Sequence, residues 1–286
     1  MSSRNFMAML QKKWNEGKFV CVGLDSQYEK IPECVRLRWS GAWMATANFN
    51  RSIVDETKDS ACAYKPNSAF YEAQGSCGLQ ALVATICYIR QVAPDVPVIF
   101  DAKRGDIGNT NDGYVKAAFD EAYLMADAIT ISPYLGMEAN EPFLAQKDKG
   151  IFILCRTSNK GSNEFQDLRL DTGERLYQRV AENVSKYWNK NGNCGLVVGA
   201  TFPDELQNVR NMVGDMPILI PGIGAQGGDL ENTVRAGKNS KNGGMIINSS
   251  RQIIFASNGP DFAEAARRET QKLHDSITQI LKGSAA

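Results

Sequence analysis

The chain has 286 residues, of which 43% are hydrophobic and 22% are charged, and its 32 basic residues balance its 32 acidic ones. This length suits one α/β barrel, which typically takes ~250 residues. The zero net charge argues against a nucleic-acid or anionic-membrane surface, although it allows a local basic pocket. No apolar run reaches the ~18 residues of a membrane span. The first residues also lack the apolar core of a signal peptide, so we expect a cytoplasmic protein.

Short apolar runs rich in β-branched residues recur along the chain, and several of them are followed by amphipathic stretches. The first amphipathic stretch, residues 6–16, precedes the first apolar run and is placed to close the bottom of a barrel. The candidate strands are residues 19–25, 61–67, 97–103, 128–132, 151–157, 194–200, 217–223 and 244–249. The clearest candidate helices between and after them are residues 79–92, 112–125, 174–188 and 262–281.

The alternation of strands with helices indicates a parallel sheet. The strands are almost continuously apolar, as expected when both faces of a sheet are covered. Eight such units in one chain favour a closed barrel over the alternative, an open doubly wound sheet. We therefore predict an α/β fold, a single (β/α)8 TIM barrel with an additional N-terminal helix, in which residues 1–286 form one catalytic domain.

The cysteines and the single histidine limit the chemistry. None of the seven cysteines forms a Cys-x-x-Cys pair, and Cys21, Cys62, Cys155 and Cys194 lie in or beside apolar runs, which fits buried free thiols better than disulfides or zinc. His274 lies near the end of the last predicted helix, where we expect a surface residue. One histidine argues against His-based metal sites and Ser-His-Asp catalysis. Acid–base work is therefore expected from Lys, Asp or Glu.

Charged side chains gather where the first three predicted strands end. Asp101 and Lys103 are two positions apart and therefore share one face of the third strand, and Asp106 follows in the loop. Lys65 ends the second strand, ~5 Å away, and Asp25 ends the first. Catalytic groups of a barrel collect at this end of the strands. Because buried charges are costly to desolvate, the cluster favours a catalytic site over a purely structural salt-bridge network.

The last two strands lead into a glycine-rich loop, residues 221–229, and into Arg251. Glycines let backbone N–H groups approach an anion, and an arginine can bind a phosphate with two hydrogen bonds. Many barrels bind phosphate at these two loops. The fifth strand leads into a polar stretch, residues 158–171, which we interpret as a long loop or lid on the active face. These residues indicate an enzyme acting on a small phosphorylated substrate, without specifying the reaction.

The segment Phe-Asp-Ala-Lys-Arg-Gly-Asp-Ile-Gly-Asn-Thr at residues 100–110 closely resembles the signature of orotidine 5′-monophosphate decarboxylases. It is most similar to the longer-chain branch of that family. Supporting elements are Lys-Pro-Asn at 65–67, Ser-Pro-Tyr-Leu-Gly at 132–136, Arg-Thr-Ser-Asn at 156–159 and Pro-Gly-Ile-Gly-Ala-Gln at 221–226. The resemblance covers roughly residues 19–255. It implies the cofactor-free and metal-free conversion of orotidine 5′-monophosphate to UMP and carbon dioxide, the last step of UMP biosynthesis.

The resemblance also implies roles for the charged cluster. Lys103 would donate a proton to carbon 6 of the pyrimidine as the carboxylate leaves, and Asp101 would lie against that carboxylate. Lys65 and Asp106 would complete the charged array, while Lys65 and Asp25 would reach ribose hydroxyls. No cofactor ring receives the electrons in such a reaction, so stabilisation would be electrostatic.

The same resemblance implies a homodimer and a set of substrate contacts. Asp106, Ile107 and Thr110 would enter the site of the partner subunit. Thr157 and Ser158 would meet the pyrimidine, with Asn67 nearby. The remaining implied residues of the binding site are Pro221, which would line the pocket, Gly224, and the phosphate ligands Gln226 and Arg251.

Two other functions stay open at this point. One is a metal-dependent sugar-phosphate decarboxylase or aldolase of the same superfamily, which shares the Asp-x-Lys-x-x-Asp motif but uses magnesium. Extra carboxylates at the strand ends would favour it, whereas here Asn67, Thr157 and Ser158 occupy such positions. The other is a catalytically silent phosphate-binding barrel, against which the intact charged cluster argues.

Overall fold

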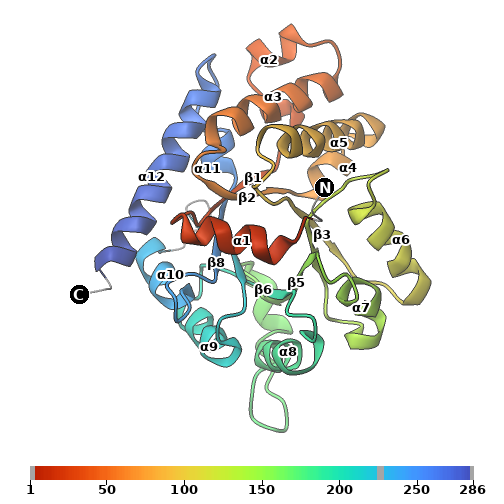
Figure 1. Ribbon diagram of the computed structural model, residues 1–286, viewed down its shortest axis with the longest axis vertical. Helices are drawn as coiled ribbons and strands as arrows, with labels where there is room; N and C mark the ends of the chain where they lie inside the picture. Colours follow the sequence, from red (N-terminus) through yellow and green to blue (C-terminus); the bar gives the residue numbers. More distant parts are fainter. Residues whose placement is uncertain (1–3, 224–228, 284–286) are drawn as a thin grey trace.

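Eight parallel strands surround the centre of the molecule in the computed structural model, which describes residues 4–223 and 229–283 (Figure 1). They are β1 (Val20–Leu24), β2 (Ala61–Pro66), β3 (Ile99–Arg104), β4 (Ala128–Ile131), β5 (Gly150–Arg156), β6 (Cys194–Val198), β7 (Ile218–Pro221) and β8 (Met245–Ser249). Their hydrogen-bonded order is β2-β1-β8-β7-β6-β5-β4-β3. Parallel bridges from Tyr64 to Val98 and from Asn67 to Asp101 join β2 to β3. These bridges bring the two ends of the sheet together, so the predicted barrel is confirmed and the open-sheet alternative is wrong.

Helices cover the outside of the ring (Figure 1). They are α1 (Phe6–Asn15), α2 (Glu33–Arg38), α3 (Ala42–Thr57), α4 (Ser68–Glu72), α5 (Gly75–Val92), α6 (Gly108–Phe119), α7 (Gly136–Leu144), α8 (Leu176–Asn183), α9 (Pro203–Val213), α10 (Leu230–Gly237), α11 (Arg251–Ile254) and α12 (Phe262–Gly283). Short 3-10 turns occupy Tyr28–Lys30 (η1) and Lys160–Glu164 (η2), and a π-helical turn, Val184–Trp188 (η3), extends α8. Within the described residues, no helix is both long and apolar enough to cross a membrane.

The predicted strands agree with the observed ones to within one or two residues at each end. The predicted helix 112–125 differs more, because α6 begins at Gly108 and ends at Phe119. The Asp120 side chain accepts a hydrogen bond from the backbone N–H of Ala122 at 2.8 Å, and Met125 takes a positive φ of 54°. Both features favour a turn over a continued helix. The apolar residues beyond Asp120 therefore follow the helix without belonging to it.

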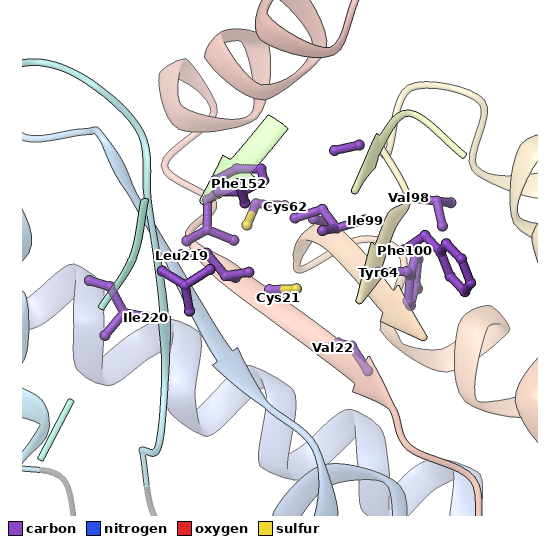
Figure 2. Packing of buried hydrophobic residues seen from close by; sticks show 14 of the residues in the cluster. Cys21, Val22, Cys62, Tyr64, Val98, Ile99, Phe100, Phe152, Leu219 and Ile220 are labelled. Carbon is purple, nitrogen blue, oxygen red and sulfur yellow. The ribbon is translucent and has the colours of Figure 1, made fainter. Parts of the chain in front are cut away.

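The interior of the barrel is filled by side chains from alternate positions of the strands. Figure 2 shows Cys21, Ile99, Phe152 and Leu219 directed into the ring, and all four are almost completely buried. Tyr64 points outward instead, and its hydroxyl donates to the backbone carbonyl of Val54 in α3. Successive side chains of a strand alternate between the two faces, which explains why both faces of these strands are apolar.

Helix α1 lies across the N-terminal ends of the strands, as the sequence predicted (Figure 1). The ring of Phe6 meets the ring of Phe152 edge to face at 5.6 Å between centroids. A side chain at Gly150 would collide with Phe6, so the glycine allows this close approach. At the other end of the helix, the indole N–H of Trp14 donates to the carbonyl of Met245 at 2.9 Å. The bottom of the barrel is thereby closed, and the open end is the one formed by the C-terminal ends of the strands.

The cysteines behave as predicted. All seven are free, and Cys21, Cys62, Cys155 and Cys194 are buried. Burial raises the pKa of the Cys21 thiol to about 12, because desolvation disfavours the thiolate. His274 is half-buried on α12, which makes it less exposed than expected.

Candidate active site

Three charged side chains meet at the ends of β2 and β3. The Lys65 ammonium lies 2.7 Å from Asp101 Oδ2, and the Lys103 ammonium lies 2.7 Å from Asp101 Oδ1. Asp25, at the end of β1, places its Oδ1 3.8 Å from the Lys65 nitrogen. The bridge from Asn67 to Asp101 fixes the offset between β2 and β3 that makes this contact possible. The predicted convergence of these residues is therefore found in the structure.

The members of this cluster differ in exposure. The Lys65 side chain is 4% exposed and that of Asp101 is 10% exposed, whereas that of Lys103 is 47% exposed. Lys103 is thus the group that faces the open mouth, while Lys65 and Asp101 lie beneath it. Asp25 Oδ1 is buried without a hydrogen-bond partner among the described residues, so it is an unsatisfied acceptor beside the cavity that Asp25 lines.

The close packing of opposite charges keeps Asp101 and Lys65 ionised. Burial alone would raise the pKa of the Asp101 carboxyl, but the charges and hydrogen bonds of Lys65 and Lys103 outweigh it and hold that pKa well below its usual range. Burial likewise opposes the charge on Lys65, yet the carboxylates of Asp101 and Asp25 raise its pKa above the ordinary value. At neutral pH the site therefore carries a fixed alternation of positive and negative charge.

A cavity of about 480 Å³ opens over this cluster. Nine of the residues predicted from the sequence line it: Asp25, Lys65, Asn67, Asp101, Lys103, Thr157, Ser158, Pro221 and Arg251. Apolar walls come from β5, β6 and β7, namely Leu154, Val197 and Leu219. The cavity thus has charges at one side, a guanidinium at another, and an apolar surface between them that suits a flat ring.

Three of the predicted residues that the structure describes, Asp106, Ile107 and Thr110, do not line this cavity. Asp106 turns back on its own loop, where its Oδ1 accepts from the N–H of Ile107 at 2.7 Å. Ile107 on the same loop and Thr110 in the first turn of α6 are exposed. Within one chain, Asp106 therefore does not join the cluster that the strand-end pattern suggested. Gly224 and Gln226 lie outside the described residues.

The cavity also contains residues that the sequence reasoning missed. Gln166 holds Thr157 in place, because its Oε1 accepts from the Thr157 N–H at 2.8 Å and its amide donates to the Thr157 hydroxyl at 2.9 Å. Nothing in the sequence marks Gln166, since the contact depends on how the intervening loop folds back. Asn248 and Ser250 also line the cavity. Their position on either side of Ser249, the last residue of β8, was a usable signal, because functional residues of a barrel gather at the C-terminal ends of the strands.

Arg156 anchors the long loop that follows β5. Its side chain is 2% exposed, and its guanidinium lies 4.1 Å from the centre of the Phe202 ring. It donates to the Ser162 hydroxyl and, at 3.0 Å, to the Asp167 carboxylate. The stretch 158–171, expected as a loop or lid, is thus a folded segment that contains η2. The buried guanidinium of Arg156 connects it to the barrel through hydrogen bonds.

The chain resembles known proteins along nearly its whole length. The family model described as "Orotidine 5'-phosphate decarboxylase / HUMPS family" matches residues 18–268. A protein of Ralstonia pickettii named orotidine 5'-phosphate decarboxylase is 48% identical over 276 residues, which cover 96% of this chain and 98% of the relative. One of the same name from Cellvibrio japonicus is 44% identical over 274 residues, covering 96% of this chain and 98% of the relative.

Solved structures are also similar to this chain over nearly its whole length. The structure of Leishmania donovani OMP decarboxylase superposes with a TM-score of 0.83 at 38% identity, covering 97% of this chain and 99% of that one. The UMP synthase of the same organism superposes with a TM-score of 0.86 at 39% identity, but there the match covers 98% of this chain and 57% of the larger protein. With a family match over most of its residues and relatives at nearly half identity, this chain belongs to the orotidine 5'-phosphate decarboxylase / HUMPS family.

Proposed function

We propose that this chain decarboxylates orotidine 5′-monophosphate to UMP and carbon dioxide, the step that completes UMP in pyrimidine biosynthesis. The observation that carries the proposal is the Lys65–Asp101–Lys103 array at the base of a cavity whose other side presents Arg251. An anionic phosphate and a pyrimidine carboxylate at opposite ends of one substrate match these two features. The names of the relatives agree with this reaction.

The chemistry follows from the charges. The bond between carbon 6 and the carboxylate breaks, its electron pair stays on carbon 6, and carbon dioxide departs. The Lys103 ammonium faces the cavity and supplies the proton that forms the new C–H bond, after which water reprotonates the amine. Asp101, held ionised by Lys65 and Lys103, lies beside the position that we assign to the departing carboxylate. A fixed ammonium beside the developing negative charge stabilises it without reorganisation during the reaction.

The phosphate lies far from the reacting carbon in this arrangement. Arg251 begins α11 directly after β8, and the Pro221 end of β7 is next to it in the sheet. We assign the phosphate to Arg251 together with Gln226 and Gly224, and the pyrimidine to Thr157 and Ser158. Binding energy from such a remote group can order loops around the substrate and so raise turnover as well as affinity.

We also propose a homodimer in which Asp106, Ile107 and Thr110 complete the partner's site. The support is their position: these residues follow the C-terminal end of β3 and are not among the described residues that line the cavity of their own chain. Ile107 is 61% exposed and Tyr134 is 85% exposed, which is unusual for large apolar side chains and suits a contact between subunits. The free cysteines fit a reducing compartment, so we place this single-domain enzyme in the cytoplasm.

The test is the loss of orotidine 5′-monophosphate absorbance with purified protein, with and without EDTA, beside Lys103→Ala. We expect turnover that resists EDTA and collapses in the variant. No turnover by folded wild-type protein would reject the proposal and favour a silent phosphate-binding barrel or a sister sugar-phosphate activity. Turnover that EDTA abolishes would contradict the metal-free mechanism.

A further inference from the structure

A threonine on β4, Thr130, contacts two of the charged residues of β3, Asp101 and Lys103. Thr130 is buried, and its hydroxyl donates to Asp101 Oδ1 at 2.8 Å. The same oxygen accepts a hydrogen bond from the backbone N–H of Lys103 at 3.0 Å. A hydroxyl has one proton to give, so these two contacts fix its orientation. Thr130 thus connects the Asp101 carboxylate to the Lys103 backbone.

The backbone that Thr130 holds is unusual. Lys103 has a φ of +49°, in the left-handed region that residues with a Cβ rarely adopt. The register between β3 and β4 also shifts between Phe100 and Arg104, which marks a bulge or irregularity in the segment that contains Lys103. Bulges next to active sites change the direction of a side chain. A conformation of this kind persists only where neighbouring contacts hold it, and the hydrogen bond to Thr130 is one such contact.

Thr130 also completes the surroundings of Asp101. Asp101 Oδ1 accepts from the Lys103 ammonium and from the Thr130 hydroxyl, while Oδ2 accepts from the Lys65 ammonium. Without the hydroxyl, the carboxylate would keep the two ammonium contacts but lose its third hydrogen bond, and the Lys103 N–H would lose its partner on Thr130. Thr130 is not among the described residues that line the cavity. Its effect on a substrate therefore passes through Asp101 and Lys103.

We propose that Thr130 is a positioning residue that sets the Lys103 ammonium and the Asp101 carboxylate in their reactive geometry. The expected loss of kcat rests on the proposed decarboxylase function. The expected change in the conformation of Lys103 does not depend on that function. A small displacement of a catalytic group costs up to ~100-fold in rate. Contacts to phosphate and pyrimidine arise from other strands, so Thr130 acts on turnover and leaves binding nearly unchanged.

The kinetic test compares Thr130→Val, which keeps the shape and removes the hydroxyl, with Thr130→Ser, which keeps the hydroxyl. We expect kcat to fall by about 10- to 100-fold in the valine variant, with KM and the Kd for UMP within about threefold of wild type. The serine variant should recover most of the activity. The matched control is Thr270→Val, a buried threonine of α12 whose hydroxyl bonds only its own helix at Ala266 and whose loss should leave kcat unchanged. Wild-type kcat in Thr130→Val, or equal losses in the valine and serine variants, would overturn the inference.

The structural test needs no turnover. Crystal structures of Thr130→Val and Thr130→Ser should differ at Lys103: we expect the positive φ and the 2.7 Å contact to Asp101 to survive only with serine. If the valine variant does not fold, Thr130→Ala gives the same comparison. An unchanged Lys103 in the valine or alanine variant would reject the positioning role. Absence of turnover in wild-type protein would reject the decarboxylase proposal, and the crystal structures would then decide the role of Thr130 by themselves.

Discussion

At the scale of single residues, Asp101 is the centre of the site. Its pKa is lowered in the folded chain, so it contributes stability that is present above its ordinary value of 3.8 and is lost as the pH falls through the folded value. The pKa of Lys65 is raised, so its contribution is present below its ordinary value of 10.5 and is lost as the pH rises through the folded value. Between these ordinary values the ion pair contributes fully.

Asp101→Asn should therefore destabilise the fold as well as abolish turnover. It leaves the buried Lys65 ammonium with only the more distant Asp25 carboxylate, and removing one partner of a buried pair costs about 3 kcal/mol or more. Urea unfolding should show this difference from wild type, constant from about pH 5 to 9 and smaller in strong acid. The exposed Asp59→Asn serves as control. An equally stable Asp101→Asn would show that the ion pair does not contribute to stability.

Arg251 gives a second prediction at this scale. It is exposed at the cavity rim, so Arg251→Ala should leave the charged cluster and the stability of the fold intact. Loss of a guanidinium that binds phosphate should raise KM strongly and lower kcat/KM by about 100-fold or more. Steady-state kinetics beside Arg267→Ala, an exposed arginine on α12, provides the comparison. An unchanged kcat/KM would remove the phosphate assignment.

At the scale of elements, the segment between β5 and α8 depends on one buried cation. Arg156 donates hydrogen bonds to Ser162 and Asp167. Gln166, in the same segment, accepts a hydrogen bond from the N–H of Thr157 at the cavity wall. The two features are linked, because the fold of the segment determines where Gln166 lies.

Arg156→Met should loosen this segment, because methionine fills part of the space but donates no hydrogen bond. We expect a higher KM and faster amide exchange over residues 158–167, with a loss of stability of about 2–3 kcal/mol. Arg175→Met is a matched control, because Arg175 contacts the same Asp167 carboxylate at 2.7 Å but its side chain is 39% exposed. Equal effects of the two substitutions would show that burial of Arg156 is unimportant.

At the scale of the whole molecule, one chain contains an incomplete set of the charged residues that the motif predicts. Lys65, Asp101 and Lys103 converge in one cavity, while Asp106 is not among the described residues that line it. If two chains share their sites, Lys103→Ala inactivates the site of its own chain, whereas Asp106→Ala inactivates the site of the partner chain. A mixed dimer then carries one intact site, formed by the wild-type Lys103 of one chain and the wild-type Asp106 of the other.

Mixing the two inactive variants should therefore restore activity. Random exchange makes half of the dimers mixed, with one intact site of two, so about one quarter of the wild-type activity should return. The measurement is turnover after mixing, beside light scattering to determine the oligomeric state. The control is each variant alone, taken through the same exchange procedure. Absence of recovery from fully exchanged mixed dimers would contradict the shared site.

The sequence by itself determined the eight strands, the buried thiols and the cluster of Lys65, Asp101 and Lys103. These are local properties: strand periodicity sets which side chains share a face, and the ends of parallel strands meet at one end of a barrel. The family resemblance added the reaction, because charge and spacing alone indicate only an enzyme of a small phosphorylated substrate.

Only the tertiary structure decided four contacts: the register of β2 against β3, the path of the loop that brings Gln166 to Thr157, the hydrogen bond of Asp106 to its own loop, and the hydrogen bond from Lys103 to Thr130. Each depends on the register between strands or on the fold of a loop. A shift of one residue along a strand moves every side chain to the other face, so such contacts are absent from the sequence pattern and follow from packing of the complete barrel.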